Sequence, residues 1–168
     1  MGENRRVLRQ AGFTMLEVLI AIVVLSIGLL GVAGMQANSL KNNHAAYTKT
    51  QATNLASDIA ERMRANPEGV DHYAGFDSKG TIKSAPTCIS SGCTPQQLAE
   101  YDLYYWSLPV VSATDPVLPQ GQALIEQSGS EFTITLLWYE RNLQGVARNE
   151  CIDDQPEDIA CFELGLTL

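Results

Sequence analysis

Apolar residues dominate the chain from Phe13 to Met35 and mark its most distinctive stretch. These 23 residues would span about 34 Å as an α-helix, because each residue adds about 1.5 Å. A hydrocarbon core is about 30 Å thick, so the stretch is long enough to cross a membrane. Glu17 is its only ionisable side chain. A charge in hydrocarbon costs about 2.5–3.5 kcal/mol even on the lowest scales, so we expect Glu17 to have a partner.

A helical alternation of apolar and charged residues follows this stretch. From position 52 onward the apolar residues recur at a spacing of three or four, and the charged residues lie on other faces. The apolar positions are Ala52, Leu55, Ala56, Ile59 and Met63. Asn66-Pro67 ends the pattern, because the residue before a proline is pushed out of the helical region. The pattern predicts one helix from Phe13 to about Ala65, with a protruding apolar half and an amphipathic half packed on a globular part.

The middle of the chain predicts a loop and a second helix. Residues 68–93 are rich in Gly, Ser, Asp and Pro without a sustained period, which is typical of a surface loop. Thr94, Pro95 and Gln97 have the order of a helix start, with Thr94 as the N-cap. The predicted helix runs from Pro95 to about Leu108. Its predicted buried face contains Leu98, Tyr101, Tyr105 and Leu108. For its aromatic residues we favour core packing over a sugar- or peptide-binding face: Tyr101, Tyr104, Tyr105 and Trp106.

After Gly121 the apolar period changes to two. Residues 122–127 and 131–140 predict two strands joined by a turn, and residues 161–168 predict a third strand. The middle strand becomes apolar on both faces near Leu137 and Tyr139, so we expect it to be central. The predicted fold class is α+β, with a small antiparallel sheet of about three to four strands laid across the amphipathic half of the long helix.

Four cysteines lie in two close pairs, Cys88 with Cys93 and Cys151 with Cys161. Such pairs are typical of disulfides in an oxidising compartment such as the periplasm. Four cysteines allow three pairings, of which we favour the two local ones, so that both pairs close loops. Zinc is the disfavoured alternative, because only Cys88 and Cys93 have a spacing close to that of a zinc site.

The charge of the chain disfavours nucleic acid as a partner. The 168 residues carry a net charge of −8 at pH 7, and an acidic surface has no electrostatic affinity for phosphate backbones. The first twelve residues differ, because Arg5, Arg6 and Arg9 against Glu3 give them a net charge of +2. The remaining residues therefore carry −10. The length suits one domain with a protruding helix.

The junction between the basic leader and the apolar stretch resembles the class III signal of type IV prepilins and pseudopilins. The motif is Gly12-Phe13-Thr14-Met15-Leu16-Glu17-Val18. The resemblance implies that a prepilin peptidase cuts between Gly12 and Phe13 and N-methylates Phe13. It also implies that Glu17 pairs with the N-terminal amine of a neighbouring subunit. In a low-dielectric filament core this pair attracts far more strongly than in water, so it would set the subunit register as well as supply energy.

The same resemblance implies a division of the chain and a location. Residues 1–12 are the cleaved leader, residues 13–38 the transmembrane and filament-core helix, and residues 39–168 the periplasmic pilin head. The chain is expected to cross the inner membrane once, in contact with its lipids, and afterwards to be part of an extracellular pilus. The α+β arrangement inferred from the strand pattern agrees with the fold that the pilin family has.

Features of the later part of the chain sharpen the resemblance. Cysteines near the C-terminus, a strand that ends in Trp-Tyr-Glu-Arg, and Asp102 and Trp106 ahead of Leu-Pro resemble the minor pilins called PilV, the type IV pilus modification proteins. This implies a structural subunit that primes filament assembly at or near the pilus tip. Its implied partners are other minor pilins, the major pilin and a tip adhesin. Pseudopilins of type II secretion systems share the leader and the long helix and are the main alternative.

Interpretations from other classes stay open. An ordinary signal peptide cleaved after Ala33 would release a soluble periplasmic binding protein, although its apolar region is usually about 7–15 residues and this one is longer. An uncleaved membrane anchor and an anchored enzyme are further alternatives. Neither His44 nor His72 has a catalytic partner at motif spacing. We therefore predict no catalytic residue, no cofactor and no metal ion.

An acidic segment near the C-terminus is the last candidate. Acidic residues crowd into or beside the loop between Cys151 and Cys161, namely Glu150, Asp153, Asp154, Glu157 and Asp158. Calcium binds such oxygen ligands, but the spacing is not that of an EF-hand, so we favour a solvated acidic loop. Our hypothesis is that Asp153, Asp154 and Asp158 form a contact surface for a partner protein.

Overall fold

A computed structural model describes residues 13–80, 84–88, 90–140, 151–152, 156 and 158–168 of the chain. The chain divides into two compact units, one that ends at Asn43 and one from His44 to Leu168. One helix, α1 (Met15–Ala65), contributes to both units.

Helix α1 ends at the predicted residue and begins at Met15, two residues after the predicted start at Phe13. At its start, the hydroxyl oxygen of Thr14 accepts a hydrogen bond from the backbone N–H of Glu17 at 3.2 Å, which satisfies one of the donors that a helix leaves unpaired in its first turn. At its end, Asn66 leaves the helix and Pro67 begins a short 3-10 helix, η1 (Pro67–Tyr73). The prediction of one helix to about Ala65 is confirmed.

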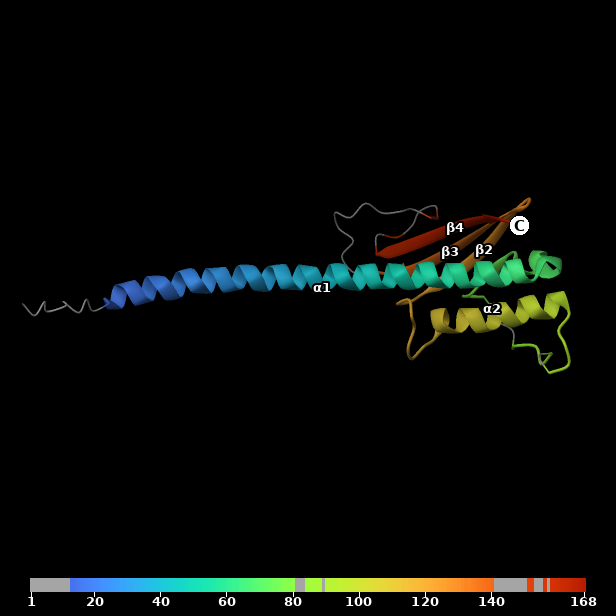
Figure 1. Ribbon diagram of the computed structural model, residues 1–168, viewed down its shortest axis with the longest axis horizontal. Helices are drawn as coiled ribbons and strands as arrows, with labels where there is room; N and C mark the ends of the chain where they lie inside the picture. The colour runs from blue at the N-terminus through green and yellow to red at the C-terminus, as the bar shows by residue number, and fades with distance from the viewer. Residues whose placement is uncertain (1–12, 81–83, 89, 141–150, 153–155, 157) are drawn as a thin grey trace, which may run out of the picture. The chain divides into compact units, whose positions relative to one another are not determined.

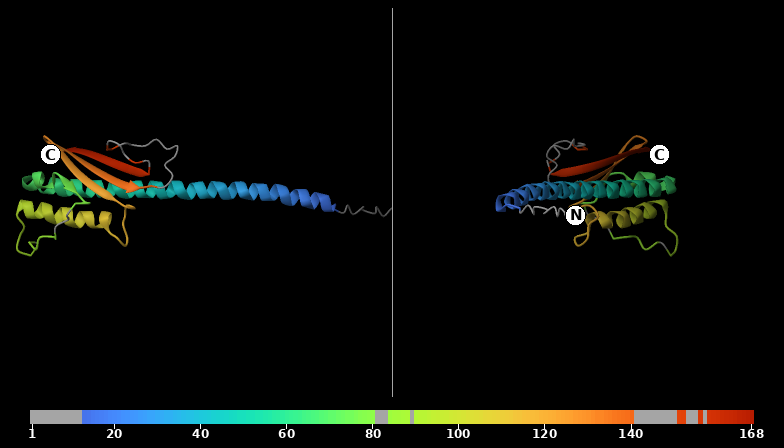
Figure 2. Two further views of the ribbon diagram at one scale, coloured as in Figure 1. Left: turned by 180° about the vertical axis from the view of Figure 1, so that it is seen from behind. Right: turned by 60° about the vertical axis from the view of Figure 1, so that its left-hand side comes forward.

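The second unit has three layers. A four-stranded antiparallel sheet of order β1-β2-β3-β4 covers one side of the C-terminal half of α1, and helix α2 (Pro95–Val111) covers the other side (Figure 1). The two further views in Figure 2 show the same order of layers. The strands are β1 (Phe76–Asp77), β2 (Gln122–Ser128), β3 (Glu131–Tyr139) and β4 (Ile159–Thr167). The predicted α+β fold with disulfide-closed loops is confirmed.

The sheet follows the predicted alternation. Strands β2 and β3 form a hairpin in which Ser128 pairs with Glu131, and Gly129 in the turn has a φ of 65°, a conformation that glycine adopts without strain. Strand β3 lies between β2 and β4, as its apolar residues on both faces predicted. Strand β4 begins two residues before the predicted start, at Ile159.

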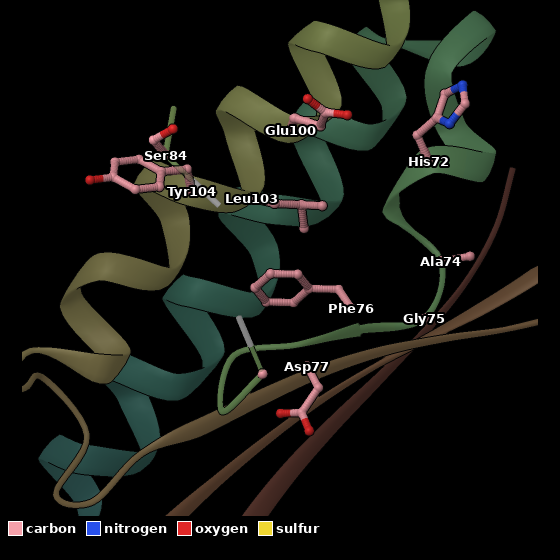
Figure 3. Close-up of a pocket in the computed structure, with 10 residues that line it drawn as sticks. His72, Ala74, Gly75, Phe76, Asp77, Ser84, Glu100, Leu103 and Tyr104 are labelled. Carbon is pink, nitrogen blue, oxygen red and sulfur yellow. The ribbon is translucent and has the colours of Figure 1, made fainter. Parts of the chain in front are cut away.

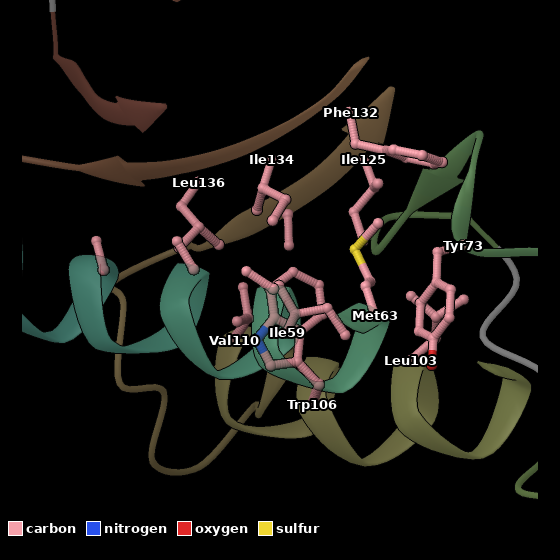
Figure 4. Packing of buried hydrophobic residues seen from close by; sticks show 14 of the residues in the cluster. Ile59, Met63, Tyr73, Leu103, Trp106, Val110, Ile125, Phe132, Ile134 and Leu136 are labelled. Carbon is pink, nitrogen blue, oxygen red and sulfur yellow. The ribbon is translucent and has the colours of Figure 1, made fainter. Parts of the chain in front are cut away.

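The hydrophobic core lies between the layers of the second unit. In Figure 4, side chains from β2 and β3 point onto α1, and those of Leu103, Trp106 and Val110 point onto it from α2. Trp106 is buried, and its indole N–H donates a hydrogen bond to the backbone carbonyl of Leu55 at 2.8 Å. The predicted helical stripe is largely buried: Ala52, Ala56, Ile59 and Met63 are fully enclosed, and Leu55 packs at the edge.

The prediction that residues 68–93 form only a surface loop was wrong. They contain η1 and β1, and the side chain of Tyr73 is completely buried. A Cβ atom at Gly69 would lie 2.5 Å from the carbonyl oxygen of Pro95, so a glycine is what allows η1 to approach the start of α2. Both elements are too short to produce a periodic pattern in the sequence.

Helix α2 begins with the predicted cap but differs in its length and in its buried face. Thr94 and Gln97 form both hydrogen bonds of a capping box. The helix continues two residues past Pro109, to Val111, although a proline inside a helix removes one backbone hydrogen bond and its ring crowds the carbonyl four residues earlier. The predicted buried face was wrong: Tyr105 is 45% exposed and Leu108 is 40% exposed. The residues that α2 buries are Ala99, Asp102, Leu103, Trp106, Ser107 and Val110.

Candidate functional site

The first candidate site is the apolar part of α1 in the first unit. By its length and apolar composition, α1 is the one helix among the described residues that could cross a membrane. No residue in its most apolar 18-residue segment is buried. Every side chain from Phe13 to Asn43 is exposed in the single chain. Such a surface requires either lipid or other apolar helices around it.

Glu17 lies in the first turn of α1, surrounded by this apolar surface. A carboxylate in the first turn interacts favourably with the positive end of the helix dipole. The role of Thr14 was not predicted: its hydroxyl oxygen accepts a hydrogen bond from the N–H of Glu17 and so fixes the start of the helix. The signal was present, because Thr14 and Glu17 have the spacing of a capping box. Gly12 lies outside the described residues, so the geometry covers Phe13 onward.

The second candidate is the acidic segment near the C-terminus. Asp153 and Asp154 lie outside the described residues, whereas Asp158 is exposed and its backbone carbonyl accepts a hydrogen bond from the N–H of Glu140 at 2.8 Å. A disulfide between Cys151 and Cys161 joins the segment to β4. Within the described residues, no cluster of three or more His, Cys, Asp or Glu side chains could hold a metal ion. The role of this segment as a contact surface stays a prediction.

All four cysteines are described, and all are in disulfides. Cys88 bonds to Cys93 and Cys151 bonds to Cys161, so both pairings are the local ones. A disulfide sulfur is not a thiolate ligand, so the zinc alternative does not apply to this state of the chain. Both bonds require an oxidising compartment to form and persist.

A buried polar cluster, which was not predicted from the sequence, joins α1, η1 and α2. Asp102 on α2 is only 7% exposed. One of its carboxylate oxygens accepts a hydrogen bond from the guanidinium of Arg62 at 3.1 Å, and the other accepts one from the hydroxyl of Tyr73 at 2.7 Å. Asn66 extends the cluster, because its side-chain amide donates to the hydroxyl of Tyr73 at 3.4 Å and to the carbonyl of Pro95 at 2.8 Å. The cluster is a structural tie between three elements.

The environment of this cluster shifts the pKa values of two of its members. Burial raises the pKa of the Tyr73 hydroxyl well above its ordinary value, and the hydrogen bond to Asp102 raises it further, against the opposing effects of Asn66 and Arg62. Burial lowers the pKa of the Arg62 guanidinium, but its hydrogen bonds to Asp58 and Asp102 outweigh burial and raise the pKa above its ordinary value. Both shifts favour the protonated hydroxyl of Tyr73 and the protonated guanidinium of Arg62, which are the forms that donate hydrogen bonds to Asp102.

Replacing Tyr73 by phenylalanine is expected to lower the free energy of unfolding by about 1.5–3 kcal/mol at neutral pH, the usual range for a hydrogen bond to a charged group. The raised pKa means that the folded state favours the protonated hydroxyl, so its contribution is complete below about pH 10 and is lost as the pH rises through the higher folded pKa. Urea unfolding of the full chain in detergent, from about pH 8 to about pH 11, measures both effects.

Tyr47→Phe is the matched control for this experiment, since Tyr47 is 61% exposed. It should retain the stability and the alkaline dependence of the wild type, whereas Tyr73→Phe should lose part of that dependence. An alkaline dependence in Tyr73→Phe equal to that of the wild type would contradict the assigned shift.

Two protein families match the chain, and their matches adjoin. Residues 8–33 match the prokaryotic N-terminal methylation motif, and residues 34–104 match the family described as type IV pilin Tt1218. No curated protein and no solved structure matches the chain. The first match includes Gly12, Phe13 and Glu17, and the second extends through η1 into α2. Neither match names the PilV proteins, so that finer resemblance stays a prediction.

Proposed function

Because the chain belongs to the type IV pilins, we propose that it is a minor pilin, a structural subunit present in few copies that helps to start the assembly of a pilus. The family is one of structural subunits, and the methylation motif implies processing by a prepilin peptidase and assembly with other pilins. The proposal depends above all on one observation, which is the exposed apolar surface of residues 13–35, where Glu17 is the only ionisable side chain.

The proposed processing site lies between Gly12 and Phe13, with Phe13 as the methylated residue. The start of α1 supports this position. Helix α1 begins at Met15 behind its cap Thr14, so cleavage before Phe13 leaves the helix and its cap intact. The new amine is then attached one residue before the cap, and the carboxylate of Glu17 follows one helical turn later.

The proposed assembly step is an exchange of lipid for neighbouring helices. An isolated subunit keeps the apolar surface of α1 in the inner membrane, where the positive leader holds the N-terminus on the cytoplasmic side and the head is in the periplasm. In the filament, helices of other subunits replace the lipid, and Glu17 meets the amine of a neighbour in a low-dielectric environment. A subunit that is out of register would leave both charges unpaired, which is costly.

The proposed position at or near the tip rests on the features that resemble PilV proteins. Its partners there would be other minor pilins, the major pilin and a tip adhesin. The acidic segment with Asp153, Asp154 and Asp158 is the proposed contact surface for one of these partners. The two disulfides support a head that functions outside the cytoplasm.

Mass spectrometry of filaments sheared from the native cells tests the function. The N-terminal peptide of this chain should begin with N-methylated Phe13, and the chain should be far less abundant than the major pilin. A chain that begins at Gly34 would indicate a signal peptide, and one that begins at Met1 would indicate an uncleaved anchor, so either result would overturn the proposal. An abundance equal to that of the major pilin would overturn the minor role alone, and presence only in a secretion apparatus would favour a pseudopilin.

A further inference from the structure

Helix α2 has a second apolar face that its own fold does not bury. Tyr101, Tyr104, Tyr105 and Leu108 have the spacing i, i+3, i+4 and i+7 of one helical stripe, which we name the tyrosine strip. Tyr101 and Tyr104 are half-buried, and Tyr105 and Leu108 are exposed. The opposite face of α2 already packs in the core. The core of this unit therefore covers only one of the two apolar faces of α2.

The geometry of the strip favours a protein partner over a sugar. The rings of Tyr101 and Tyr105 have centroids 4.5 Å apart and planes tilted by 46°, and those of Tyr104 and Tyr105 are 5.1 Å apart at 82°. Rings at such angles form an uneven surface, whereas a sugar stacks on an open, flat ring face. None of the three hydroxyls bonds to another described residue, so within the described part of the chain all three are available to donate to a partner. Exposed tyrosines of this kind are enriched in protein interfaces.

A pocket of about 400 Å³ adjoins the strip, because Tyr104 lines both. The side chains of Phe76 and Leu103 give the pocket an apolar part (Figure 3). Two carboxylates line it, but Asp77 already accepts hydrogen bonds from the N–H of Lys79 and from Gln122, each at 2.9 Å. Glu100 accepts only one bond from a described residue, from the amide of Gln96 at 3.1 Å. His72 is the one basic residue among the described lining.

Charge indicates which partner fits this surface. The strip contains no charged residue, and the carboxylate of Glu100 borders it. A lysine or arginine side chain suits the pocket, since its apolar stem can lie on Phe76 and Leu103 while its cationic group pairs with Glu100. After loss of the leader, each copy of this chain carries −10, so two copies repel each other. Charge therefore favours as the partner a different molecule that has a basic side chain beside an apolar surface.

We propose that the tyrosine strip and the Glu100 pocket bind the head of a neighbouring pilin of another sequence, which inserts a lysine or arginine side chain into the pocket. This inference rests on the proposed function, because bundling the α1 helices of different pilins is what brings their heads together. It assigns the contact to α2, separately from the acidic segment near the C-terminus.

Photo-crosslinking of the full chain in its native cells tests the contact. A photoreactive amino acid replaces Tyr105 in one variant and Ser130, in the exposed β2–β3 turn, in the control. Position 105 should crosslink to another pilin that carries the methylation motif, with a lysine or arginine near the linked residue, and position 130 should not link to that site. Adding Glu100→Arg should reduce the yield at position 105 by about ten-fold or more, as expected for a central contact. Adding Glu126→Arg, an equal charge change on an exposed residue of β2, should not.

The remaining outcomes separate this inference from the proposed function. A chain that is processed at Phe13 and found in filaments, but gives no crosslink at position 105, overturns the inference and leaves the function intact. A crosslink to a second copy of this chain or to a protein that is not a pilin also overturns the inference. A chain that is not processed at Phe13 overturns the proposed function and this inference with it.

Discussion

Replacing Glu17 by alanine should leave cleavage and membrane insertion intact and reduce incorporation into filaments by about 30-fold or more. The reason is the amine of the neighbouring subunit, which is left unpaired when the carboxylate is removed. Truncating one member of a buried charge pair costs about 2–5 kcal/mol, and about 1.4 kcal/mol corresponds to a factor of ten. The measurement compares the amount of the processed chain in the membrane with the amount in sheared filaments.

Ser26 provides a matched control within the same apolar helix. Its hydroxyl donates a hydrogen bond to the carbonyl of Ile22 at 2.7 Å, so this polar group is satisfied inside its own helix and needs no neighbour. Ser26→Ala should therefore incorporate like the wild type. Glu17→Gln keeps the size of the side chain without its charge and should fail nearly as severely as Glu17→Ala. Normal incorporation of Glu17→Ala would remove the register role from this residue.

The match to the N-terminal methylation motif could be predicted because the parts of the motif are local in the sequence. Gly12, Phe13 and Glu17 lie within six positions, and the apolar stretch that follows makes the carboxylate conspicuous. The ends of α1 and the three long strands were predictable for a similar reason. Caps, prolines and periods of 3.6 or two residues are signals within a single element, and no distant contact overrides them here.

The buried face of α2 could not be predicted, because a distant partner determines it. The predicted buried face did not include Asp102, and an isolated carboxylate is costly to bury. The burial of Asp102 is tolerated because Arg62 lies 40 positions earlier in the chain and Tyr73 lies 29 positions earlier. The predicted face contained Tyr101 and Tyr105, whereas the observed buried face contains Asp102 and Trp106. The predicted stripe is apolar, but it lies on the outer face of α2 and not on the face that packs in the core.

The same residue shows how a resemblance and a structural role can coincide. Asp102 and Trp106 were two of the features that resembled PilV proteins. In this fold, Asp102 binds Arg62 and Tyr73, and Trp106 donates to the carbonyl of Leu55. Both residues hold α2 against α1. Packing of the two helices is therefore enough to explain why an aspartate and a tryptophan occur four positions apart on α2. The resemblance at these positions therefore supports a shared fold more directly than a shared partner.

Replacing Asp102 by alanine should lower the free energy of unfolding of the head by about 2–3 kcal/mol. Removing one partner from a fully buried ion pair costs about 3–5 kcal/mol. The expected loss is smaller here, because the side chain of Arg62 is 35% exposed and water can solvate part of its charge. Tyr73 adds to the loss, because its buried hydroxyl would have no carboxylate to bind. Urea unfolding of the full chain in detergent measures the change.

Asp58 is the control that the structure provides for this experiment, because both carboxylates bind the same guanidinium at 3.1 Å. Asp58 is 48% exposed and lies one turn from Arg62 on α1, so Asp58→Ala should cost only about 0.5 kcal/mol or less. Asp102→Asn should fall between the two, since an amide oxygen can accept from Tyr73 but lacks the charge that pairs with Arg62. Equal losses for Asp58→Ala and Asp102→Ala would mean that burial does not distinguish the two pairs. In that case, the tie between α1, η1 and α2 would depend on the apolar packing around Trp106.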